Sequence, residues 1–335
     1  MKSRTKNLLS KEEITKLVKV NFGDTCEVGT ITELKGGMFN SAYLVERVKE
    51  KDKIVLKVSI APGTKTLTYE KDPMPTEVEV YKRIAQCTQI PAPRLLSYDF
   101  SKKVIPCNYF FMTALKGVAM NKVMKNISKD NLESIKIEVA SYFAQLHRIN
   151  GEYFGYFTDD PKYWFSTWKE AFLHMMEMLI ADGIAHHVKM PYARIGKILK
   201  QKALYLDAVK NPSLIDYDLW TGNIFLIEQK DQYVIEGIID FERAFWGDPL
   251  ADFPAAFLLL KNIKEERSFW KAYTKAARIN PDITKEDEIR LDLYSLYISM
   301  IMAAETFRYD LIYAFLQGAF ARHHIMKFLK RLEKD

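Results

Sequence analysis

The sequence has few cysteines: Cys26, Cys87 and Cys107 are the only three among 335 residues. An odd number of cysteines without a CxxC pair predicts neither a disulfide framework nor a cysteine-based metal site. The segment 1–17 also lacks the apolar stretch that a signal peptide needs. We therefore expect a protein of the reducing cytoplasm.

Long hydrophobic runs are also missing. The most apolar stretch covers 253–260 and stops at Lys261, whereas about 20 apolar residues are needed to cross a bilayer. Neither sign of charge dominates, because 49 Lys and Arg face 43 Asp and Glu. The basic residues are scattered, so we expect no membrane and no nucleic-acid partner. With 48% hydrophobic residues, the chain can build one large core or two smaller ones.

The N-terminal part has the patterns of a sheet with one helix. Short runs of Val, Ile and Thr alternate with turn-like segments over 25–58, which predicts antiparallel strands. A helix-compatible apolar pattern follows over 74–89, and prolines end it. The segment 103–115 then reads as a further strand.

Beyond Gly117 the apolar residues recur every three to four positions, which predicts helices. One strand pair is expected within this region, over 223–241. The predicted fold class is therefore α+β, with a small antiparallel sheet in an N-terminal lobe at 1–115. A larger, mainly helical lobe is expected at 116–335.

An acidic segment at 216–252 stands out, with nine acidic and two basic residues. Asp218 and Asn223 lie five residues apart in a predicted loop, and Asp240 ends the strand pair that follows. Phosphoryl transfer needs a carboxylate to take the acceptor's proton, and an Asn and an Asp to hold magnesium. We predict Asp218 as the catalytic base and Asn223 and Asp240 as metal ligands. Turn capping by the same residues is the alternative.

Lys57 lies in an apolar strand, where a lone lysine usually marks an edge or a solvent-facing position. A glycine-containing turn at 35–41 precedes it, and exposed N–H groups in such a turn can meet phosphate oxygens. Glu77, early in the first predicted helix, can hold the lysine in an ion pair. The nucleotide-contacting residues that we predict in this lobe are Gly37, Asn40, Ser41, Lys57 and Glu77.

Together these segments resemble the aminoglycoside phosphotransferase and choline kinase superfamily, small-molecule kinases with a protein-kinase-like fold. The resemblance covers nearly the whole chain and is carried by GGMFNSAYLVE, VLKVS, YDLWTGNIF and GIIDFERAFWGDPLADF. DLWTGN is also similar to the fructosamine kinase branch. The resemblance implies ATP or GTP between two lobes, Mg²⁺, and transfer of the γ-phosphate to a hydroxyl of a small molecule. Sugar derivatives, amino alcohols and aminoglycosides are the expected acceptors, and the protein is expected to be a monomer or homodimer.

One residue departs from this family. Its pattern is His-x-Asp-x4-Asn, and Asp216 stands in place of the histidine. The histidine is usually a scaffold of the catalytic loop, so we expect a scaffold role for Asp216. Its charge would raise the pKa of a neighbouring carboxyl. The alternative is a catalytically impaired pseudokinase that binds a nucleotide or ligand and acts as a regulatory protein.

The resemblance implies further site residues. We expect the nucleotide base against the segment before the second lobe, at Met112, Thr113 and Leu115, through backbone groups. Trp220 can stack on a sugar ring or an ammonium group. Glu305 and Arg308 lie at i, i+3, where we favour a plain intrahelical ion pair over an acceptor contact. The acceptor candidates are Trp220, Glu242, Glu305 and Arg308.

Overall fold

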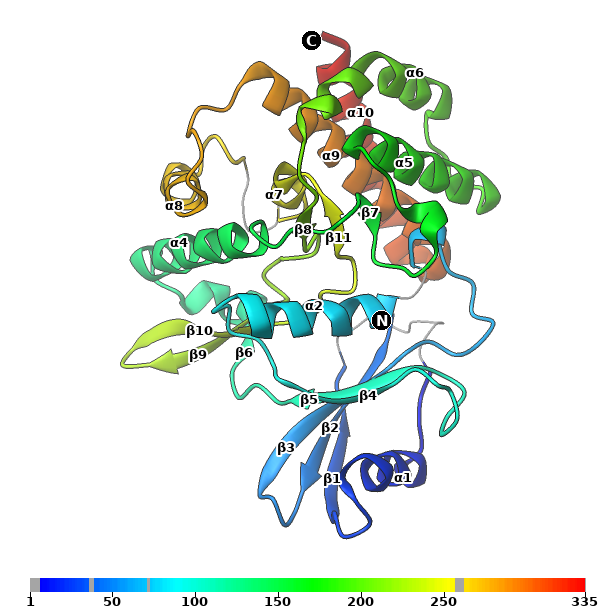
Figure 1. The fold of residues 1–335 in the computed structure, drawn as a ribbon, viewed down its shortest axis with the longest axis vertical. Helices are drawn as coiled ribbons and strands as arrows, with labels where there is room; N and C mark the ends of the chain where they lie inside the picture. The colour runs from blue at the N-terminus through cyan, green and yellow to red at the C-terminus, as the bar shows by residue number, and fades with distance from the viewer. Residues whose placement is uncertain (1–6, 36–38, 71–72, 257–261, 335) are drawn as a thin grey trace.

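The computed structural model describes residues 7–35, 39–70, 73–256 and 262–334 and has two lobes (Figure 1). The N-terminal lobe is built on an antiparallel sheet with the strand order β1-β2-β3-β5-β4. This confirms the predicted sheet. Its elements are α1 (Lys11–Phe22), β1 (Val28–Glu33), β2 (Ser41–Arg47), β3 (Asp52–Val58), α2 (Pro73–Cys87), β4 (Leu95–Asp99) and β5 (Tyr109–Thr113).

The alternation of side chains along strand β3 places Lys57 at the boundary between the lobes. Side chains alternate between the two faces of a strand, and Ile54, Leu56 and Val58 pack with α1 in one apolar cluster. Val55 lies on the opposite face, in the large core that includes α2. Lys57 has the parity of Val55, so it points toward α2 and the second lobe.

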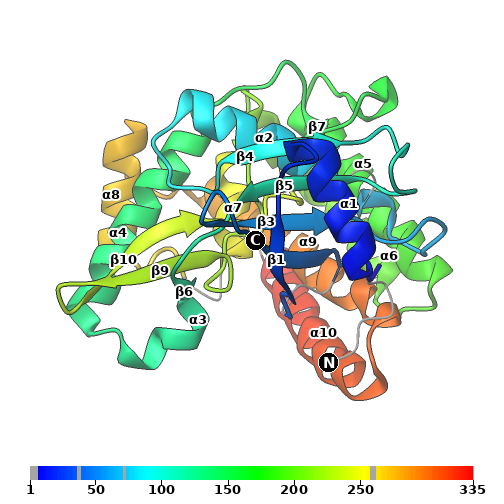
Figure 2. The ribbon, with the colours of Figure 1, turned by 90° about the horizontal axis from the view of Figure 1, so that it is seen from below.

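Helix α1 is absent from our sequence-based predictions. Its N-terminus carries a capping box: Ser10 Oγ accepts a hydrogen bond from the Glu13 N–H, and the Glu13 carboxylate accepts one from the Ser10 N–H. A Ser-x-x-Glu pattern before apolar residues was therefore available as a signal. The helix covers the sheet face opposite to α2, as Figure 2 shows from below.

Helices dominate the second lobe, as predicted, and α9 runs through it (Figure 1). The buried residues of α9 lie between Ile289 and Ala304. No described helix is long and apolar enough to cross a membrane. The helices are α3 (Met120–Val123), α4 (Lys129–Leu146), α5 (Trp168–Ala185), α6 (Tyr192–Lys202), α7 (Asp252–Ala255), α8 (Arg267–Ala277), α9 (Lys285–Ala304) and α10 (Leu311–Lys334). The 3₁₀ helices are η1 (Thr68–Glu70), η2 (Met124–Asn126), η3 (Pro161–Tyr163), η4 (Ala203–Ala208), η5 (Pro249–Ala251) and η6 (Glu305–Arg308).

The predicted strand pair is confirmed by β9 (Ile224–Gln229) and β10 (Gln232–Ile238). Lys230 and Asp231 form the turn between them with φ of 51° and 62°. Positive φ at both central positions is what a two-residue type I′ turn requires. The sheet β7-β11-β8 was not predicted, because strands of two or three residues give no readable alternation. The remaining short strands are β6 (Val118–Ala119), β7 (Gly155–Tyr156), β8 (Ser213–Ile215) and β11 (Phe245–Gly247).

The connector between the lobes is fixed by Glu236 of β10. Its carboxylate accepts hydrogen bonds from the N–H groups of Lys116 at 2.8 Å and Gly117 at 2.6 Å. A Cβ on Gly117 would lie 2.1 Å from the carbonyl oxygen of Leu226. Only glycine therefore allows the connector to approach β9 this closely.

Candidate active site

Lys57 lies at the centre of a cluster of carboxylates between the lobes. Its Nζ is 2.6 Å from Glu77 of α2, 2.6 Å from Asp240 and 3.3 Å from Glu242. The predicted ion pair with Glu77 is therefore present, and the C-terminal lobe adds two further carboxylates. We call these four residues the nucleotide-side cluster.

The charges of this cluster do not balance. Burial alone would lower the pKa of Lys57, but three carboxylates outweigh burial and hold it well above its usual range. Burial raises the pKa of Glu77, and the charges of Asp240 and Glu242 add to the rise against the opposing effect of the ammonium. One cation shared by three carboxylates leaves a site that favours further positive charge.

The residues present fit a magnesium ion. Carboxylate oxygens of Glu77, Asp240 and Glu242 lie within 4.8 Å of one another, and hard oxygen donors are what Mg²⁺ binds. Asn223 is brought next to this group because its carbonyl oxygen accepts a hydrogen bond from the Ile239 N–H at 3.0 Å. Asp240 has a φ of 74°, a strained conformation that is common at functional sites.

Asp218 lies in the loop between β8 and β9. The Asn223 side chain donates to its carbonyl oxygen at 2.9 Å, which closes the loop. Its own side chain is 27% exposed, and Arg243 Nε lies 3.7 Å from its Oδ2. Burial in this cleft raises the pKa of Asp218 to about 8; the guanidinium opposes this rise and neighbouring carboxylates add to it. A pKa near the working pH suits a general base.

Asp252 holds the loop that carries Asp218 through hydrogen bonds with its backbone. Its carboxylate accepts hydrogen bonds from the N–H groups of Asp216 at 3.2 Å and Tyr217 at 2.6 Å. His147 Nε2 lies 2.9 Å from the same carboxylate, and its Nδ1 lies 2.8 Å from the hydroxyl of Tyr273. Loop, carboxylate and histidine therefore form one buried chain of hydrogen bonds.

Asp216 itself is buried, with 1% of its surface exposed. Neither of its carboxyl oxygens has a hydrogen-bond partner within the described ranges. Burial raises its pKa well above the usual range, and the charges of Asp252, Asp218 and Asp240 add to this rise. Burial therefore favours the neutral form of this carboxyl, whereas the backbone N–H of Asp216 donates to Asp252.

A second charged group adjoins Asp218. Arg243 Nη2 donates to Glu305 at 2.6 Å, and the hydroxyl of Tyr69 donates to the same carboxylate oxygen at 2.6 Å. Arg308 donates to Glu70 at 2.5 Å. We call Glu70, Arg243, Glu305 and Arg308 the acceptor-side cluster, because the sequence indicates Glu305 and Arg308 only as candidates for an acceptor contact.

The intrahelical pair that we expect for Glu305 and Arg308 is present, but it is longer than the ion pair that each residue makes elsewhere. The two side chains lie 3.9 Å apart, and each has a much closer partner from another part of the chain. Both residues are buried in η6, where helical spacing does not decide the pairing. Arg243, Tyr69 and Glu70 are missing from our predicted site residues, although Arg243 is one of only two basic residues in the acidic segment.

The other predicted nucleotide contacts lie in or next to strands β2 and β5 and the connector between the lobes. Asn40 is buried and donates to Glu242 at 2.7 Å, and Ser41 is fully buried at the start of β2. Gly37 lies outside the described residues. Met112 is buried in β5 and Thr113 is half-buried. Leu115 is half-buried, in the connector.

The tryptophan next to the catalytic loop lies close to its backbone. Trp220 is half-buried, and its ring crosses Gly222 so closely that a Cβ there would lie 2.2 Å from the indole. Trp246 is 2% exposed and packs on Phe157, with ring centroids 4.7 Å apart. Trp246 is thus a core residue, whereas Trp220 keeps an accessible edge beside Asp218.

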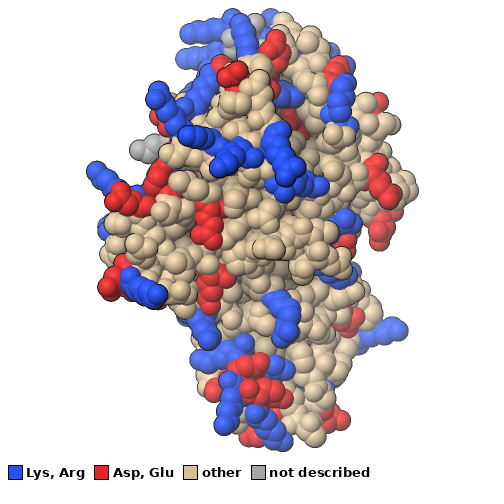
Figure 3. All heavy atoms as spheres, turned by 60° about the vertical axis from the view of Figure 1, so that its left-hand side comes forward, with Lys and Arg blue, Asp and Glu red and all other residues tan. Residues whose placement is uncertain are grey.

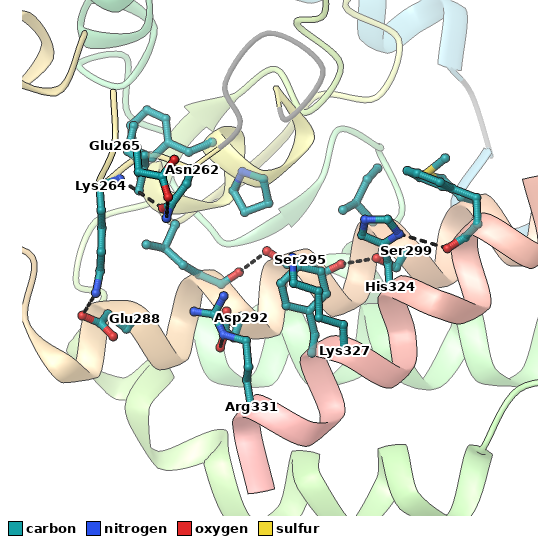
Figure 4. A pocket seen from close by; sticks show the side chains of 18 residues that line it. Asn262, Lys264, Glu265, Glu288, Asp292, Ser295, Ser299, His324, Lys327 and Arg331 are labelled. Atoms are coloured by element: carbon teal, nitrogen blue, oxygen red, sulfur yellow. Dashed lines mark hydrogen bonds and ion pairs between the residues drawn. The ribbon is translucent and has the colours of Figure 1, made fainter. Parts of the chain in front are cut away.

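A cavity of about 500 Å³ lies elsewhere, in the helical lobe between α9, α10 and the segment before α8 (Figure 4). None of the predicted site residues lines it. Two ion pairs line it, between Arg331 and Asp292 at 2.8 Å and between Lys264 and Glu288. The predicted site residues therefore lie outside this cavity.

Comparison with known proteins gives one family and one fold. The protein-family model described as "Phosphotransferase enzyme family" matches residues 30–289 of this chain. No curated protein sequence matches the chain.

Several solved structures share the architecture. An assumed aminoglycoside phosphotransferase of Ralstonia eutropha is 13% identical with a TM-score of 0.68, covering 97% of this chain and 98% of that one. A thermostable mutant of APH(4)-Ia, in a ternary complex with AMP-PNP and hygromycin B, is 18% identical with a TM-score of 0.62, covering 95% and 98%. The GDP complex of aminoglycoside 2'-phosphotransferase-IIIa is 16% identical with a TM-score of 0.61, covering 97% and 98%. These likenesses confirm the kinase-like two-lobe fold.

Proposed function

The chain belongs to the phosphotransferase enzyme family, and on this premise we propose that it transfers the γ-phosphate of ATP or GTP to a hydroxyl of a small molecule. The observation that carries the proposal is the ion pair of Lys57 with Asp240 at 2.6 Å, with Asp218 close enough for the charge of Asp240 to add to the effect of burial on its pKa. The three residues come from three separate segments of the chain. Structures of the same fold contain AMP-PNP or GDP, which supports a nucleotide donor.

Each residue has a defined task in this proposal. Lys57, held by Glu77, orients the phosphates, and the backbone of 112–115 meets the nucleotide base. Asp240 and Asn223, with Glu242 close by, would hold Mg²⁺, which neutralises charge on the phosphates when bound. The acceptor's O–H bond breaks, its proton goes to Asp218, and its oxygen bonds to the γ-phosphorus. The bond from that phosphorus to the bridging oxygen breaks and releases ADP or GDP.

The pseudokinase alternative rests on Asp216. A missing scaffold contact would support it, but Asp252 already holds the loop through the backbone N–H groups of Asp216 and Tyr217. Asp218 and the predicted metal ligands are all present. The geometry therefore favours an active enzyme over a regulatory binding protein.

The test is coupled ADP or GDP release with a panel of hydroxyl compounds, run on the wild type and on Asp218→Asn. A general base typically contributes about 10²–10⁴-fold, so we expect a loss of this size in kcat. Nucleotide affinity should stay within about twofold, because the carboxylate acts on the acceptor and not on the phosphates. Near-normal turnover in Asp218→Asn would contradict the assignment. Nucleotide binding without turnover on any compound would favour the pseudokinase.

A further inference from the structure

The charges beside Asp218 bear on the kind of acceptor that the cleft can take. A hydroxyl that gives its proton to Asp218 must lie within hydrogen-bond distance of that carboxylate. Arg243 Nε lies 3.7 Å from the same carboxylate. The acceptor must therefore bind next to a guanidinium.

The carboxylates of the acceptor-side cluster have no free oxygen to offer. Glu305 Oε1 accepts from Tyr69 and Arg243, and its Oε2 accepts from the hydroxyl of Tyr309 at 3.1 Å. The two oxygens of Glu70 accept from Arg308 at 2.5 Å and from the Leu67 N–H at 2.9 Å. An ammonium group on the acceptor would have to share an oxygen that already has a partner.

Arg243, by contrast, has hydrogen-bond donors to spare. A guanidinium has five N–H donors. Among the described residues, its Nη1 has no hydrogen-bond partner, while Nη2 is held by Glu305. The side chain is 22% exposed, compared with 7% for Glu305 and 5% for Arg308. A ligand in the cleft can therefore reach Arg243 more easily than it can reach the rest of the cluster.

We infer that the acceptor is a hydroxyl compound without an ammonium group, neutral or anionic, whose oxygen atoms accept hydrogen bonds from Arg243. The inference rests on the proposed kinase function and narrows its acceptor. A cationic acceptor would meet repulsion from the guanidinium, and it would find the carboxylates of the acceptor-side cluster already paired. Glu242, which also adjoins Arg243, shares one carboxylate oxygen with Asn40 and Lys57. An oxygen-rich acceptor would be held by charge-assisted hydrogen bonds beside Asp218.

The test compares acceptors that differ only in charge. Trios such as glucose, glucuronate and glucosamine, together with the polycation kanamycin, would be assayed for ADP release in the presence of Mg²⁺. We expect the neutral or anionic member of a productive trio to exceed the ammonium member by at least about tenfold in kcat/KM, the effect of one charge-assisted hydrogen bond. ADP release confined to ammonium-bearing compounds would overturn the inference and leave the kinase function intact.

Variants of Arg243 test the contact itself. Arg243→Gln should raise KM for the productive acceptor by about tenfold or more and lower kcat less, and Arg243→Lys should recover part of the loss. Arg194→Gln, which removes the same group from an exposed pair with Glu333, is the matched control and should leave KM unchanged. An unchanged KM in Arg243→Gln would contradict the inference. If nucleotide stabilises the protein in thermal unfolding but no compound releases ADP, the proposed function fails, and the inference fails with it.

Discussion

Two clusters of buried charge meet near Asp218, and they are balanced differently. In the nucleotide-side cluster three carboxylates share one ammonium group. In the acceptor-side cluster two guanidinium groups face two carboxylates. The first arrangement is incomplete without another cation, as a magnesium and nucleotide site would be. In the second, the protein's own positive and negative charges balance, so its side chains can form a rigid boundary of the site.

The pKa values of the two clusters follow this difference. Burial raises the pKa of Glu77, and its carboxylate neighbours add to the rise. Burial would also raise the pKa of Glu305, but Arg243 and Arg308 outweigh it and hold the value below the usual range. Both glutamates are buried, so the number of cations around each one decides the direction. The distinction can be tested by removing one charge at a time.

The largest effect on stability is expected from Glu305→Gln. This change leaves Arg243 and Arg308 short of a counter-charge in the interior, and breaking a buried pair typically costs about 3–5 kcal/mol. We expect about 3 kcal/mol less free energy of unfolding at pH 7, measured by denaturant titration. The folded-state pKa of Glu305 is lowered, so its contribution is present above its unfolded pKa of about 4.3 and is lost as pH falls through the folded value.

The matched control is Glu333→Gln, which breaks the exposed pair between Glu333 and Arg194. Exposed pairs contribute little, so the denaturation midpoint should not change measurably. If Glu305→Gln is as stable as this control, the acceptor-side cluster does not form the rigid boundary that its ion pairs suggest.

Removing one charge from the other cluster should mainly affect ligand binding. Asp240→Asn takes away a predicted magnesium ligand, and Asn tolerates the positive φ of this position. Loss of a residue that only supports a metal ligand costs about 10–100-fold in affinity, so we expect at least about tenfold weaker nucleotide binding with Mg²⁺. Calorimetry with Mg²⁺ and with EDTA measures the difference.

Without Mg²⁺, Asp240→Asn should bind nucleotide about as well as the wild type, because the carboxylate then has no metal to hold. Thermal unfolding gives a second readout: Mg²⁺ with nucleotide should stabilise the wild type more than nucleotide alone, and the variant should lose this increment. Equal loss of affinity in both buffers would show that Asp240 does not act through the metal.

The nucleotide-side cluster was partly predictable. Its Lys57–Glu77 pair joins residues 20 positions apart and was expected, whereas the contacts of Lys57 with Asp240 and Glu242 span 183 and 185 positions and were not predicted. Strand alternation places Lys57 on the face of Val55, toward the helix that carries Glu77. Asp218 and Asn223 share one loop, and Asp240 ends the strand pair that follows it. Periodicity and turn composition report such arrangements directly.

The acceptor-side cluster was not predictable in this way. Its pairs join residues that are 62 positions apart in Arg243 and Glu305, and 238 positions apart in Arg308 and Glu70. The local spacing of Glu305 and Arg308 predicts their intrahelical pair, which is present at 3.9 Å, but it gives no sign of the closer tertiary partners. The exposed charges do not indicate where this buried cluster lies, because basic and acidic side chains are interspersed on the face of the molecule shown in Figure 3.

The smallest effect is expected at Asp216, which belongs to neither cluster. Its buried carboxyl has a raised pKa and no partner within the described ranges, so the folded state keeps a proton that the unfolded chain releases above about pH 4. Stability from this group is full below that pH and is lost as pH rises toward the folded-state pKa.

Asp216→Asn cannot ionise, so its stability relative to the wild type should increase as pH rises. We expect the difference in free energy of unfolding to be larger at pH 7 than at pH 5 by at least about 1 kcal/mol, since each pH unit in this window contributes about 1.4 kcal/mol for one proton. Turnover should be retained, because Asp252 holds the loop through backbone N–H groups. A difference that is the same at both pH values would show that Asp216 is ionised in the folded state. A cation held between it and the nucleotide-side cluster would then be needed to explain its burial.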